Sequence, residues 1–422
     1  MSQARESWQS AGSGGADQGT VRRNNLSLLL RSLRDAGPRS RARLAADLGL
    51  NKATVSSLVG ELMERGLVRD GQAERGAVGR PGTSVELAGS GAYGIGAEIN
   101  VHHVTTLAVD LAGSAVSERR TSVDTRGLPP EQVVDHLVEL LQGTLSDLAD
   151  RGARPISVTV GVAGLVDLDH GLVSVAPNLG WRDVPLAELL RSRLGHDLLI
   201  EVANEANLAA VAEATPGDPE RRDILVIHGE VGIGGGIVAD GRPYQGRLGF
   251  AGEFGHMVVD RGGRRCGCGR SGCWETVVGV SRLIEMATDE DDLLRSPDVA
   301  LEVKVEELNR RAAAGDERTL QALHEVGRWV GIGAAALTNA LNPGVIVLSG
   351  YLGEIGEWIQ ADVQAELDEG VLAPDAGGTR IALSTLGFSA AVRGAAAVAI
   401  ERVYDDPTLV PRTSAEQLGA TS

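Results

Sequence analysis

One short stretch holds all three cysteines of the 422-residue chain, at positions 266, 268 and 273. His256 precedes them, at the end of the run Gly252–His256. Three thiolates and one imidazole form a complete tetrahedral ligand set for Zn²⁺, with no position left for water. A loop of free thiols beside a histidine is the alternative. Because the rest of the chain lacks cysteine, we favour a structural zinc site whose ligands are His256, Cys266, Cys268 and Cys273.

Length and composition favour several domains in a reducing compartment. A chain of 422 residues suits two or three domains, and a hydrophobic content of 43% supports ordinary buried cores. No apolar run approaches the length of a membrane span. Residues 1–20 are rich in Gly, Ser, Ala and Gln without an apolar signal segment, so we expect a disordered tail there. An odd number of cysteines, all assigned to a metal, points to the cytoplasm.

Charge is unevenly distributed along the chain. The net charge of −17 argues against nucleic-acid binding by the whole protein, yet residues 21–88 carry 12 Arg or Lys against 7 Asp or Glu. Such an asymmetry is expected when one small domain meets DNA, although an excess of this size also arises by chance.

The basic segment predicts a winged helix-turn-helix domain over residues 21–88. Leucines at helical spacing indicate a first helix from Asn25 to Ala36, ended by Gly37-Pro38. A second helix is expected over 41–48, with Ser40 as its cap and Gly49 at its end. Asn51 is the expected cap of a third helix. After Gly66, residues 67–69 and 83–87 alternate as the two strands of a wing.

The third helix and the wing carry candidate DNA contacts. The start of the helix presents a cation and short hydroxyl groups suited to groove edges and phosphates. The wing loop contains a glycine-flanked arginine that could enter a minor groove. A three-helix packing module without DNA is the alternative, and the wing makes it less favoured. The predicted contacts are Lys52, Thr54, Ser56, Ser57 and Arg80.

Residues 89–404 form an α/β body. Apolar β-type runs at 157–162, 198–202, 224–228, 235–238 and 345–349 alternate with helical runs at 130–151, 206–214, 317–340 and 354–369. Two strand-rich segments with glycine turns, near 94–123 and 224–260, suggest two lobes of related architecture. Residues 405–422 are polar and are expected to form a flexible tail.

The run Gly-Glu-x-Gly-His followed by Cys-x-Cys-Gly-x-x-Gly-Cys-x-Glu resembles the ROK family (repressor, open reading frame, kinase). This resemblance implies a two-lobed, actin-like (ribonuclease H-like) body with the ligand in the interlobe cleft, and zinc held by the histidine and the cysteines. It also implies a sugar pocket lined by carboxylates and amides, which suit a ring of hydroxyls. The residues that match the family's sugar site are Asn178, Asn204, Glu205, Glu253, His256 and Glu275. Taken singly, Asn178 could be a turn residue and Asn204 a helix cap.

The family includes sugar kinases and sugar-responsive regulators, and four departures favour a regulator. Sugar kinases of the family carry an aspartate base at the position of Glu205 in this chain. The longer glutamate side chain moves the carboxylate by about 1 Å, a displacement that can cost on the order of 100-fold in rate. The first phosphate loop of these kinases, Asp-x-Gly-Gly-Thr, matches the bulkier stretch Glu98–His102 here. Glu230 would place a negative charge beside an anion, and Ser349 replaces a glycine. The glycines between 232 and 236 remain, and support the kinase alternative unless they form a strand turn.

The sequence therefore predicts a cytoplasmic, sugar-responsive DNA-binding regulator, a repressor of carbohydrate-utilisation genes, without catalytic residues. The expected partners are a small sugar and an inverted-repeat operator, bound by a homodimer or a dimer of dimers, with nucleoid association on DNA. The alternative is a ROK-family sugar kinase with a regulatory N-terminal domain. A regulator controlled by a protein partner is a third, weaker hypothesis.

Overall fold

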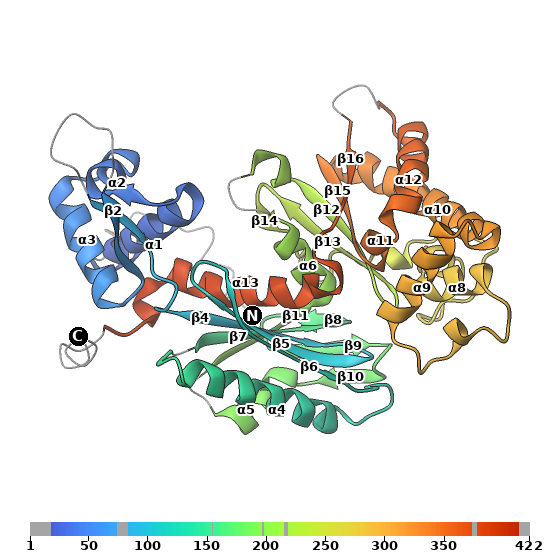
Figure 1. Ribbon diagram of the computed structural model, residues 1–422, viewed down its shortest axis with the longest axis horizontal. Coiled ribbons are helices and arrows are strands. Elements are labelled where there is room, and N and C mark those ends of the chain that lie inside the picture. Colours follow the sequence, from blue (N-terminus) through green and yellow to red (C-terminus); the bar gives the residue numbers. More distant parts are fainter. Residues whose placement is uncertain are drawn as a thin grey trace. The chain divides into compact units, whose positions relative to one another are not determined.

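The chain divides into two units of tertiary structure (Figure 1). The computed structural model describes residues 18–73, 83–153, 155–195, 198–214, 218–373 and 378–412. Within these ranges, the first unit contains the residues up to 91 and from 402 onward, and the second contains 92–401. No helix among the described residues combines the length and apolar character needed to cross a membrane.

The first unit has the three helices and the wing that the sequence predicts. Its helices are α1 (Gln18–Ala36), α2 (Arg41–Asp47) and α3 (Lys52–Glu64). Its strands β1 (Arg39–Ser40), β2 (Val68–Ala73) and β3 (Thr83–Leu87) form an antiparallel sheet in the order β1-β3-β2. The apolar faces that hold the helices together are buried, and include Leu26, Leu29, Leu30, Leu33, Leu44, Val55, Leu58, Val59 and Leu62.

Helix ends in this unit agree with the sequence at one cap and differ at two other points. The Asn51 side chain accepts a hydrogen bond from the Thr54 amide at 2.8 Å, as expected of an N-cap. Ser40 makes no side-chain cap bond and pairs instead with Ser84 in the sheet. Helix α1 begins at Gln18, seven residues before the predicted start at Asn25, because its first turns are polar and carry no apolar periodicity.

The end of the described chain packs against the first unit, although a flexible tail was expected from Asp405. Arg31 Nη2 lies 2.6 Å from Asp405 Oδ1, and Arg412 Nη2 lies 3.0 Å from Glu61 Oε1. A short 3₁₀ turn, η6 (Pro407–Leu409), lies between them, and Val410 is buried. The expected flexible tail is therefore wrong for residues 405–412, because charged residues of this segment form ion pairs with α1 and α3.

The second unit contains two five-stranded sheets of the same topology. The first has the order β11-β7-β4-β5-β6 and the second β14-β13-β12-β15-β16. In each, three consecutive antiparallel strands are followed by two strands added in parallel on the other side. The repeated order confirms the expectation of two related lobes. The strands of the first sheet are β4 (Tyr93–Ile99), β5 (His103–Asp110), β6 (Ala115–Ser122), β7 (Pro155–Val162) and β11 (Leu199–Asn204). Those of the second are β12 (Ile224–Gly229), β13 (Ile233–Ala239), β14 (Arg242–Pro243), β15 (Val345–Gly350) and β16 (Arg380–Leu383).

Helices cover both faces of the sheets (Figure 1). α4 (Pro130–Ala149) and α5 (Leu186–Leu194) cover the outer face of the first sheet, and α6 (Glu205–Glu213) and α13 (Ala390–Asp405) lie on the inner side. The outer layer of the second lobe is formed by α8 (Val280–Ala287), α9 (Leu301–Ala313), α10 (Glu317–Leu341), α11 (Tyr351–Glu354) and α12 (Gly356–Gly370). A small sheet of β8 (Leu165–Asp167), β9 (Leu172–Ala176) and β10 (Trp181–Val184) completes the first lobe.

Glycines on β4 let α13 approach the sheet closely. A Cβ added to Gly94 would lie 2.4 Å from the Ile400 amide nitrogen, and one added to Gly96 would lie 2.3 Å from the Val392 carbonyl oxygen. These glycines precede the stretch that corresponds to a phosphate loop in kinases, and here they serve helix packing.

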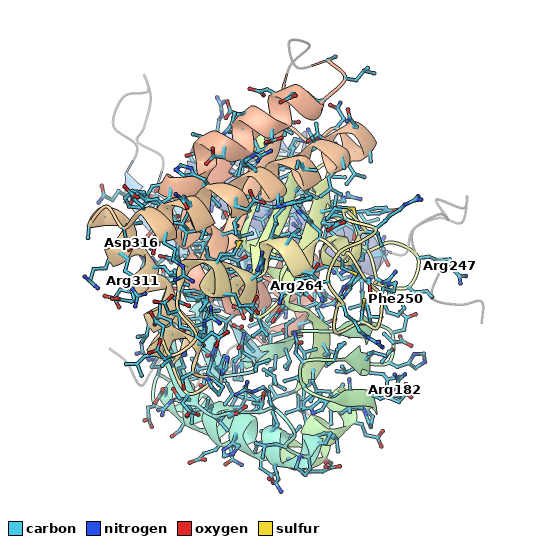
Figure 2. All side chains as sticks on the ribbon, turned by 90° about the vertical axis from the view of Figure 1, so that its right-hand side faces the viewer. Arg182, Arg247, Phe250, Arg264, Arg311 and Asp316 are labelled. Carbon is cyan, nitrogen blue, oxygen red and sulfur yellow. The ribbon has the colours of Figure 1, made fainter. Side chains whose placement is uncertain are left out.

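In the second lobe, Asp316 caps α10 by accepting a hydrogen bond from the Thr319 amide at 2.8 Å, close to Arg311 near the end of α9 (Figure 2).

Candidate functional site

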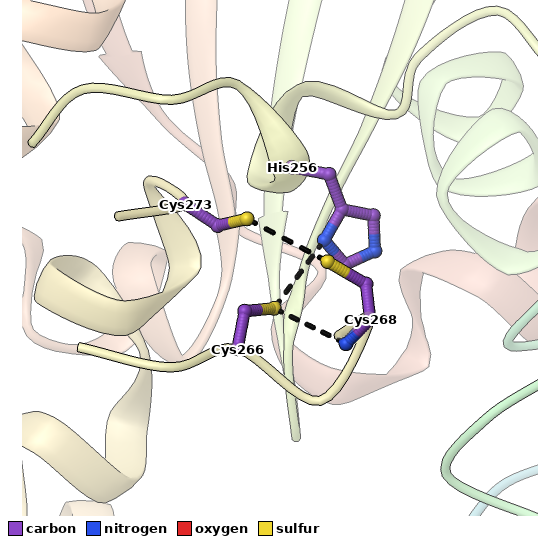
Figure 3. A group of neighbouring side chains, drawn as sticks. All are labelled: His256, Cys266, Cys268 and Cys273. Atoms are coloured by element: carbon purple, nitrogen blue, oxygen red, sulfur yellow. Dashed lines mark hydrogen bonds between the residues drawn. The ribbon is translucent and has the colours of Figure 1, made fainter. Parts of the chain in front are cut away.

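The histidine and the three cysteines come together on one folded loop (Figure 3). His256 ends the short 3₁₀ helix η3 (Phe254–His256), and the cysteine segment folds back beside it. The Trp274 amide donates to the Met257 carbonyl at 2.7 Å, and the Val259 amide donates to the Gly272 carbonyl at 2.9 Å. Arg264 pairs with Glu285 of α8 at 2.5 Å, which ties the loop to the second lobe (Figure 2).

One ligand atom from each of the four residues lies within 4.8 Å of the others, so the group could hold a metal ion. Cys268 Sγ lies 3.6 Å from Cys273 Sγ, and Cys266 Sγ lies 3.7 Å from His256 Nδ1. Burial raises the pKa of Cys266 to about 12. Burial also acts to raise the pKa of Cys268, but hydrogen bonds from Arg270 and the other thiols lower it to about 6. A bound cation would favour the thiolate form of all three.

The loop that carries His256 and the three cysteines, residues 254–273, is called the metal loop for the ion that it could hold, and it contacts the predicted sugar-site carboxylates on both sides. His256 Nε2 lies 3.9 Å from Glu253 Oε2, on the ring edge opposite the thiols. Glu275 Oε1 accepts from Cys266 Sγ at 3.6 Å, and its Oε2 accepts from the Ile233 amide at 3.1 Å. Burial raises the pKa of Glu253, an effect opposed by His256 and reinforced by Glu275. The loop therefore fixes the position of Glu275 and brings His256 close to Glu253.

The two predicted sugar-site asparagines have different surroundings. Asn178 is exposed in the turn after β9, and a Cβ added to Gly232 would lie 4.0 Å from its Nδ2 and 2.2 Å from Glu275 Oε2. Asn178 and Glu275 thus face the same glycine. Asn204 instead caps α6, accepting from the amides of Ala206 and Asn207 at 2.9 and 3.1 Å. Its Nδ2 donates to the Gly164 carbonyl at 3.0 Å, so most of its hydrogen-bonding capacity is used within the fold.

Glu205 lies with two other carboxylates, Glu98 and Glu230, with one oxygen of each within 4.8 Å of the others. We call these three residues the carboxylate cluster. Glu98 is the penultimate residue of β4, Glu205 begins α6, and Glu230 lies in the turn between β12 and β13. Burial, followed by the neighbouring carboxylates, raises the pKa of both Glu205 and Glu98 well above the usual range. Burial also opposes ionisation of Glu230, but His228 and Asn100 outweigh it and lower its pKa.

The stretches that correspond to phosphate loops are filled by protein groups. Asn100 Nδ2 donates to Glu230, and its Oδ1 accepts from the His102 amide at 3.2 Å. His228 Nδ1 and Ser349 Oγ lie 3.2 Å apart on paired strands β12 and β15. Gly234, Gly235 and Gly236 lie in β13, where a Cβ on Gly236 would lie 2.5 Å from the Ala206 carbonyl oxygen. The glycine run therefore has a packing role between β13 and α6.

The predicted DNA contacts at the start of α3 are surface groups. Lys52, Ser56 and Ser57 are exposed, and Thr54 is half-buried. Arg22 Nη2 donates to Ser57 Oγ at 3.2 Å, so α1 shares this surface. Arg80 lies outside the described residues.

The helix-turn-helix unit, the duplicated sheets and the Cys/His cluster together define a class, the ROK family with an N-terminal helix-turn-helix domain. The ROK family model matches residues 94–402, so the chain belongs to this family, and the IclR helix-turn-helix domain model matches residues 26–71. The chain is similar to the xylose repressor of Bacillus subtilis (strain 168), with 30% identity over 396 residues that cover 93% of this chain and 99% of that protein.

Two crystal structures share the fold. A ROK family transcriptional regulator, a homolog of the E. coli MLC protein, matches with a TM-score of 0.76 and 23% identity, covering 93% of this chain and 98% of that one. A ROK family glucokinase from Streptomyces griseus, in complex with glucose and AMPPNP, matches with a TM-score of 0.62 and 28% identity, covering 73% of this chain and 99% of that one. The regulator match extends over nearly the whole chain, including the first unit.

Sequence reasoning identified Glu98, Glu205 and Glu230 separately but did not predict that they meet. His103 and His228 were also missed as neighbours of this group; their ring Nε2 atoms lie 3.9 Å from Glu98 and 3.6 Å from Glu230. The signal that could have revealed this cluster is the position of the carboxylates in the two related lobes. Glu98, at the position of the kinase aspartate, lies near the end of β4, and Glu230 directly follows β12, the corresponding first strand of the second lobe.

Proposed function

We propose that this protein is a sugar-responsive DNA-binding repressor of carbohydrate-utilisation genes and that it has no kinase activity. One observation carries the proposal. The carboxylates of the sugar-site motif, Glu253 and Glu275, are held by the metal loop, while buried acidic residues occupy the stretches that correspond to phosphate loops. A helix-turn-helix unit on the same chain would bind DNA in response to the sugar.

The metal at His256, Cys266, Cys268 and Cys273 is zinc in this proposal, with a structural role. Tetrahedral zinc with bonds of about 2.3 Å to sulfur and 2.0 Å to nitrogen separates two sulfurs by about 3.8 Å, and sulfur from nitrogen by about 3.5 Å. The corresponding distances here are 3.6 and 3.7 Å. With Nδ1 of His256 toward the metal, its Nε2 faces Glu253, so the metal would also orient the pocket carboxylate.

The sugar would bind between the metal loop and the turn that carries Asn178. Glu253 and Glu275 accept hydrogen bonds from hydroxyls, Asn178 both donates and accepts, and Glu205 lies at the inner end of the site. Asn204 acts by holding the first turn of α6, and hence the Glu205 backbone, in place. The similarity to a xylose repressor makes xylose the first sugar to test.

Phosphoryl transfer is disfavoured by the charge at the carboxylate cluster. A kinase site neutralises phosphate charge with backbone amides, cations and metal ions. Here Glu98 and Glu230 are 1% and 4% exposed, and the Glu230 carboxylate retains the more acidic pKa of the group. Glu98 takes the position of an aspartate that the kinases also carry, but Glu230 adds a buried carboxylate to the glycine-rich turn and would repel a nucleotide phosphate.

DNA binding would use α3 and the wing. Two such units on a cytoplasmic homodimer or dimer of dimers would contact half-sites of an inverted repeat through Lys52, Thr54, Ser56, Ser57 and Arg80. Sugar would act through its different affinity for two conformations of the body. Helix α13 has residues in both units, and so gives the body a second covalent path to the DNA-binding unit besides the 91–92 connection.

The test begins by selecting bound sequences from a random DNA library with the full chain. A panel of aldoses, xylose first, is then screened by thermal shift, and each hit is added to the protein–DNA complex. We expect one sugar class to raise the melting temperature and change DNA affinity. A sugar-dependent release of ADP from ATP above about 1 s⁻¹ would overturn the non-catalytic assignment.

One substitution tests whether the wing contributes to DNA binding. Arg80→Ala should weaken DNA binding and leave sugar affinity unchanged. Arg69→Ala is the matched control, because Arg69 is an exposed arginine of β2 that pairs with Glu86 at 2.8 Å. Unchanged DNA binding in Arg80→Ala would remove the wing from the interface.

A further inference from the structure

The carboxylate cluster joins three structural elements from both lobes. Glu98 comes from the first sheet, Glu230 from the turn of the second, and Glu205 from the helix between the sheets. One oxygen from each lies within 4.8 Å of the others. Glu98 and Glu230 are almost fully buried, at 1% and 4% exposure. Two buried acidic groups and one half-buried group at this separation repel each other strongly when ionised.

The oxygens of the cluster are poorly satisfied by the protein. Among the described residues, no hydrogen-bond partner is found for Glu98 Oε2, Glu205 Oε2 or Glu230 Oε1, although all three atoms are buried. Buried acceptors of this kind are rare in folded proteins and carry a desolvation cost. Within the same described ranges, no arginine or lysine forms an ion pair with the cluster; the ion-pair partners are His103 and His228.

A histidine provides an independent indication of a ligand. His228 is 1% exposed, and its Nε2 has no hydrogen-bond partner among the described residues. That nitrogen points at Glu230 Oε1 from 3.6 Å, while Nδ1 is held by Ser349. A buried imidazole aimed at a carboxylate oxygen is the arrangement of groups that orient a metal-binding carboxylate.

Nearby cations are already engaged elsewhere. Arg120 contacts Glu302 and lies 3.1 Å from His103 Nδ1. The Asn100 side-chain amide donates to Glu230 and, at 3.5 Å, to Glu98 Oε1. These groups leave the cluster with more negative charge than donors to balance it.

We propose that Glu98, Glu205 and Glu230 bind a hard divalent cation of the Mg²⁺, Mn²⁺ or Ca²⁺ type. Carboxylate oxygens are the ligands these ions prefer, and metal–oxygen distances of about 2.0 to 2.6 Å place neighbouring ligand oxygens about 3 to 5 Å apart. The ion would link the end of β4 to the β12–β13 turn and thereby hold the two lobes together. It is distinct from the sulfur site, whose thiolates suit a softer metal.

Cation and sugar binding should be coupled because both involve Glu205. This consequence rests on the proposed function, whereas the cation site itself does not. Coupling is reciprocal, so a cation that tightens sugar binding is itself bound more tightly when sugar is present.

The experiment measures cation binding by the full chain purified with zinc and without sugar. Mn²⁺ is titrated and followed by its electron paramagnetic resonance signal, then displaced with Mg²⁺ and Ca²⁺. We expect one Mn²⁺ per chain, displaced by both ions, and a rise in melting temperature with each ion. Glu98→Gln and Glu230→Gln should each weaken Mn²⁺ binding at least tenfold. Glu302→Gln, a neighbouring acidic residue outside the cluster, is the matched control and should bind Mn²⁺ normally.

The outcomes separate clearly. Absence of a stoichiometric Mn²⁺ in the unmutated protein, or several weak sites unaffected by either variant, would overturn the proposal. A folded unmutated protein that binds no cation but becomes more stable on Glu230→Gln would show that the cluster shares protons instead. If a variant misfolds, as judged by circular dichroism and zinc content, the stoichiometry and displacement measured on the unmutated chain decide the question. Sugar-sensing failure leaves these measurements unaffected, since no sugar is present.

Discussion

Glu61→Gln should loosen the helix-turn-helix unit by about 2 to 3 kcal/mol at neutral pH. Glu61 lies on α3, is 5% exposed, and accepts from Arg22 Nε at 2.6 Å and Arg65 Nη2 at 2.8 Å. Arg412 Nη2, from the C-terminal segment, lies 3.0 Å away. Glutamine keeps the shape but removes the charge that three guanidinium groups share.

The magnitude follows from the pKa of Glu61. Burial acts to raise this pKa, but hydrogen bonds from Arg65, Arg22 and Arg412 lower it from 4.5 to about 2. A difference of about 2.5 pH units corresponds to about 3 kcal/mol of unfolding free energy. Because the side chains of Arg22 and Arg412 are about half exposed, solvent screening reduces this to about 2 to 3 kcal/mol. The folded-state pKa is depressed, so the stabilisation is complete above pH 4.5 and is lost as pH falls toward 2.

Hydrogen exchange of peptides covering α3 is the assay, because the two units need not unfold together. Glu61→Gln should raise the opening equilibrium of α3 roughly 30- to 150-fold at neutral pH. Glu64→Gln is the matched control: Glu64 pairs with the same Arg412 at 3.1 Å but is 55% exposed, so it should cost less than about 1 kcal/mol. Equal exchange in the two variants, or a difference from the unmutated protein that stays constant from pH 6 to pH 3, would refute the reasoning.

Three further perturbations test the site and its support. Cys268→Ser removes a thiol 3.6 Å from Cys273, so bound zinc measured by mass spectrometry, the melting temperature and the sugar response should all fall, whereas Ser271→Ala on the same loop should keep the metal; full zinc content in Cys268→Ser would contradict the ligand set. Asn204→Ala should cost about 1 to 2 kcal/mol in chemical denaturation through loss of the α6 cap, while exposed Asn178→Ala should leave stability within about 0.5 kcal/mol and lower sugar affinity; the reverse pattern would exchange their roles. Gly236→Ala places a Cβ 2.5 Å from the Ala206 carbonyl and should destabilise the second unit by about 1 to 3 kcal/mol, whereas Gly60→Ala, with nothing within 4 Å, should be neutral or stabilising; equal melting temperatures would remove the packing role of Gly236.

Local patterns in the sequence were sufficient for much of the fold. The Cys-x-Cys spacing fixes ligands on adjacent turns, so the meeting of Cys266, Cys268 and Cys273 depends on few long-range contacts. The Asn51 cap and the buried face of α3 follow from helical period and from hydrogen bonds within one turn. Strands β12 and β15 each begin with four consecutive apolar residues, because helices cover both sides of the parallel part of the sheet.

Long-range pairing set the limit of sequence reasoning. Asn204 fits a sugar ligand and a helix cap equally well in sequence, and only the structure shows that its side chain caps α6. Helix α13 was missed because small residues such as Ala395 and Ala396 pack on Gly96 and α6, leaving a weak apolar periodicity. The carboxylate cluster forms only when three segments distant in sequence come together in the fold. Neither the spacing nor the type of these residues is enough to predict that contact.

The β12–β13 hairpin connects the parts of the proposed sensor. Its Ile233 amide is held by Glu275, which also contacts Cys266 of the metal loop, and its turn carries Glu230 of the carboxylate cluster. Glycines of β13 press the hairpin onto α6, whose first residue is Glu205. A shift of Glu275 on sugar binding would therefore move the whole hairpin against α6 rather than bend it. The glycines of β13 are packed so closely against α6 that the hairpin has little room to change its own shape. Since Glu205 and Glu230 belong to these two elements, the separation of their carboxylates would change with the sugar contact, which makes cation affinity at the cluster a direct readout of pocket closure.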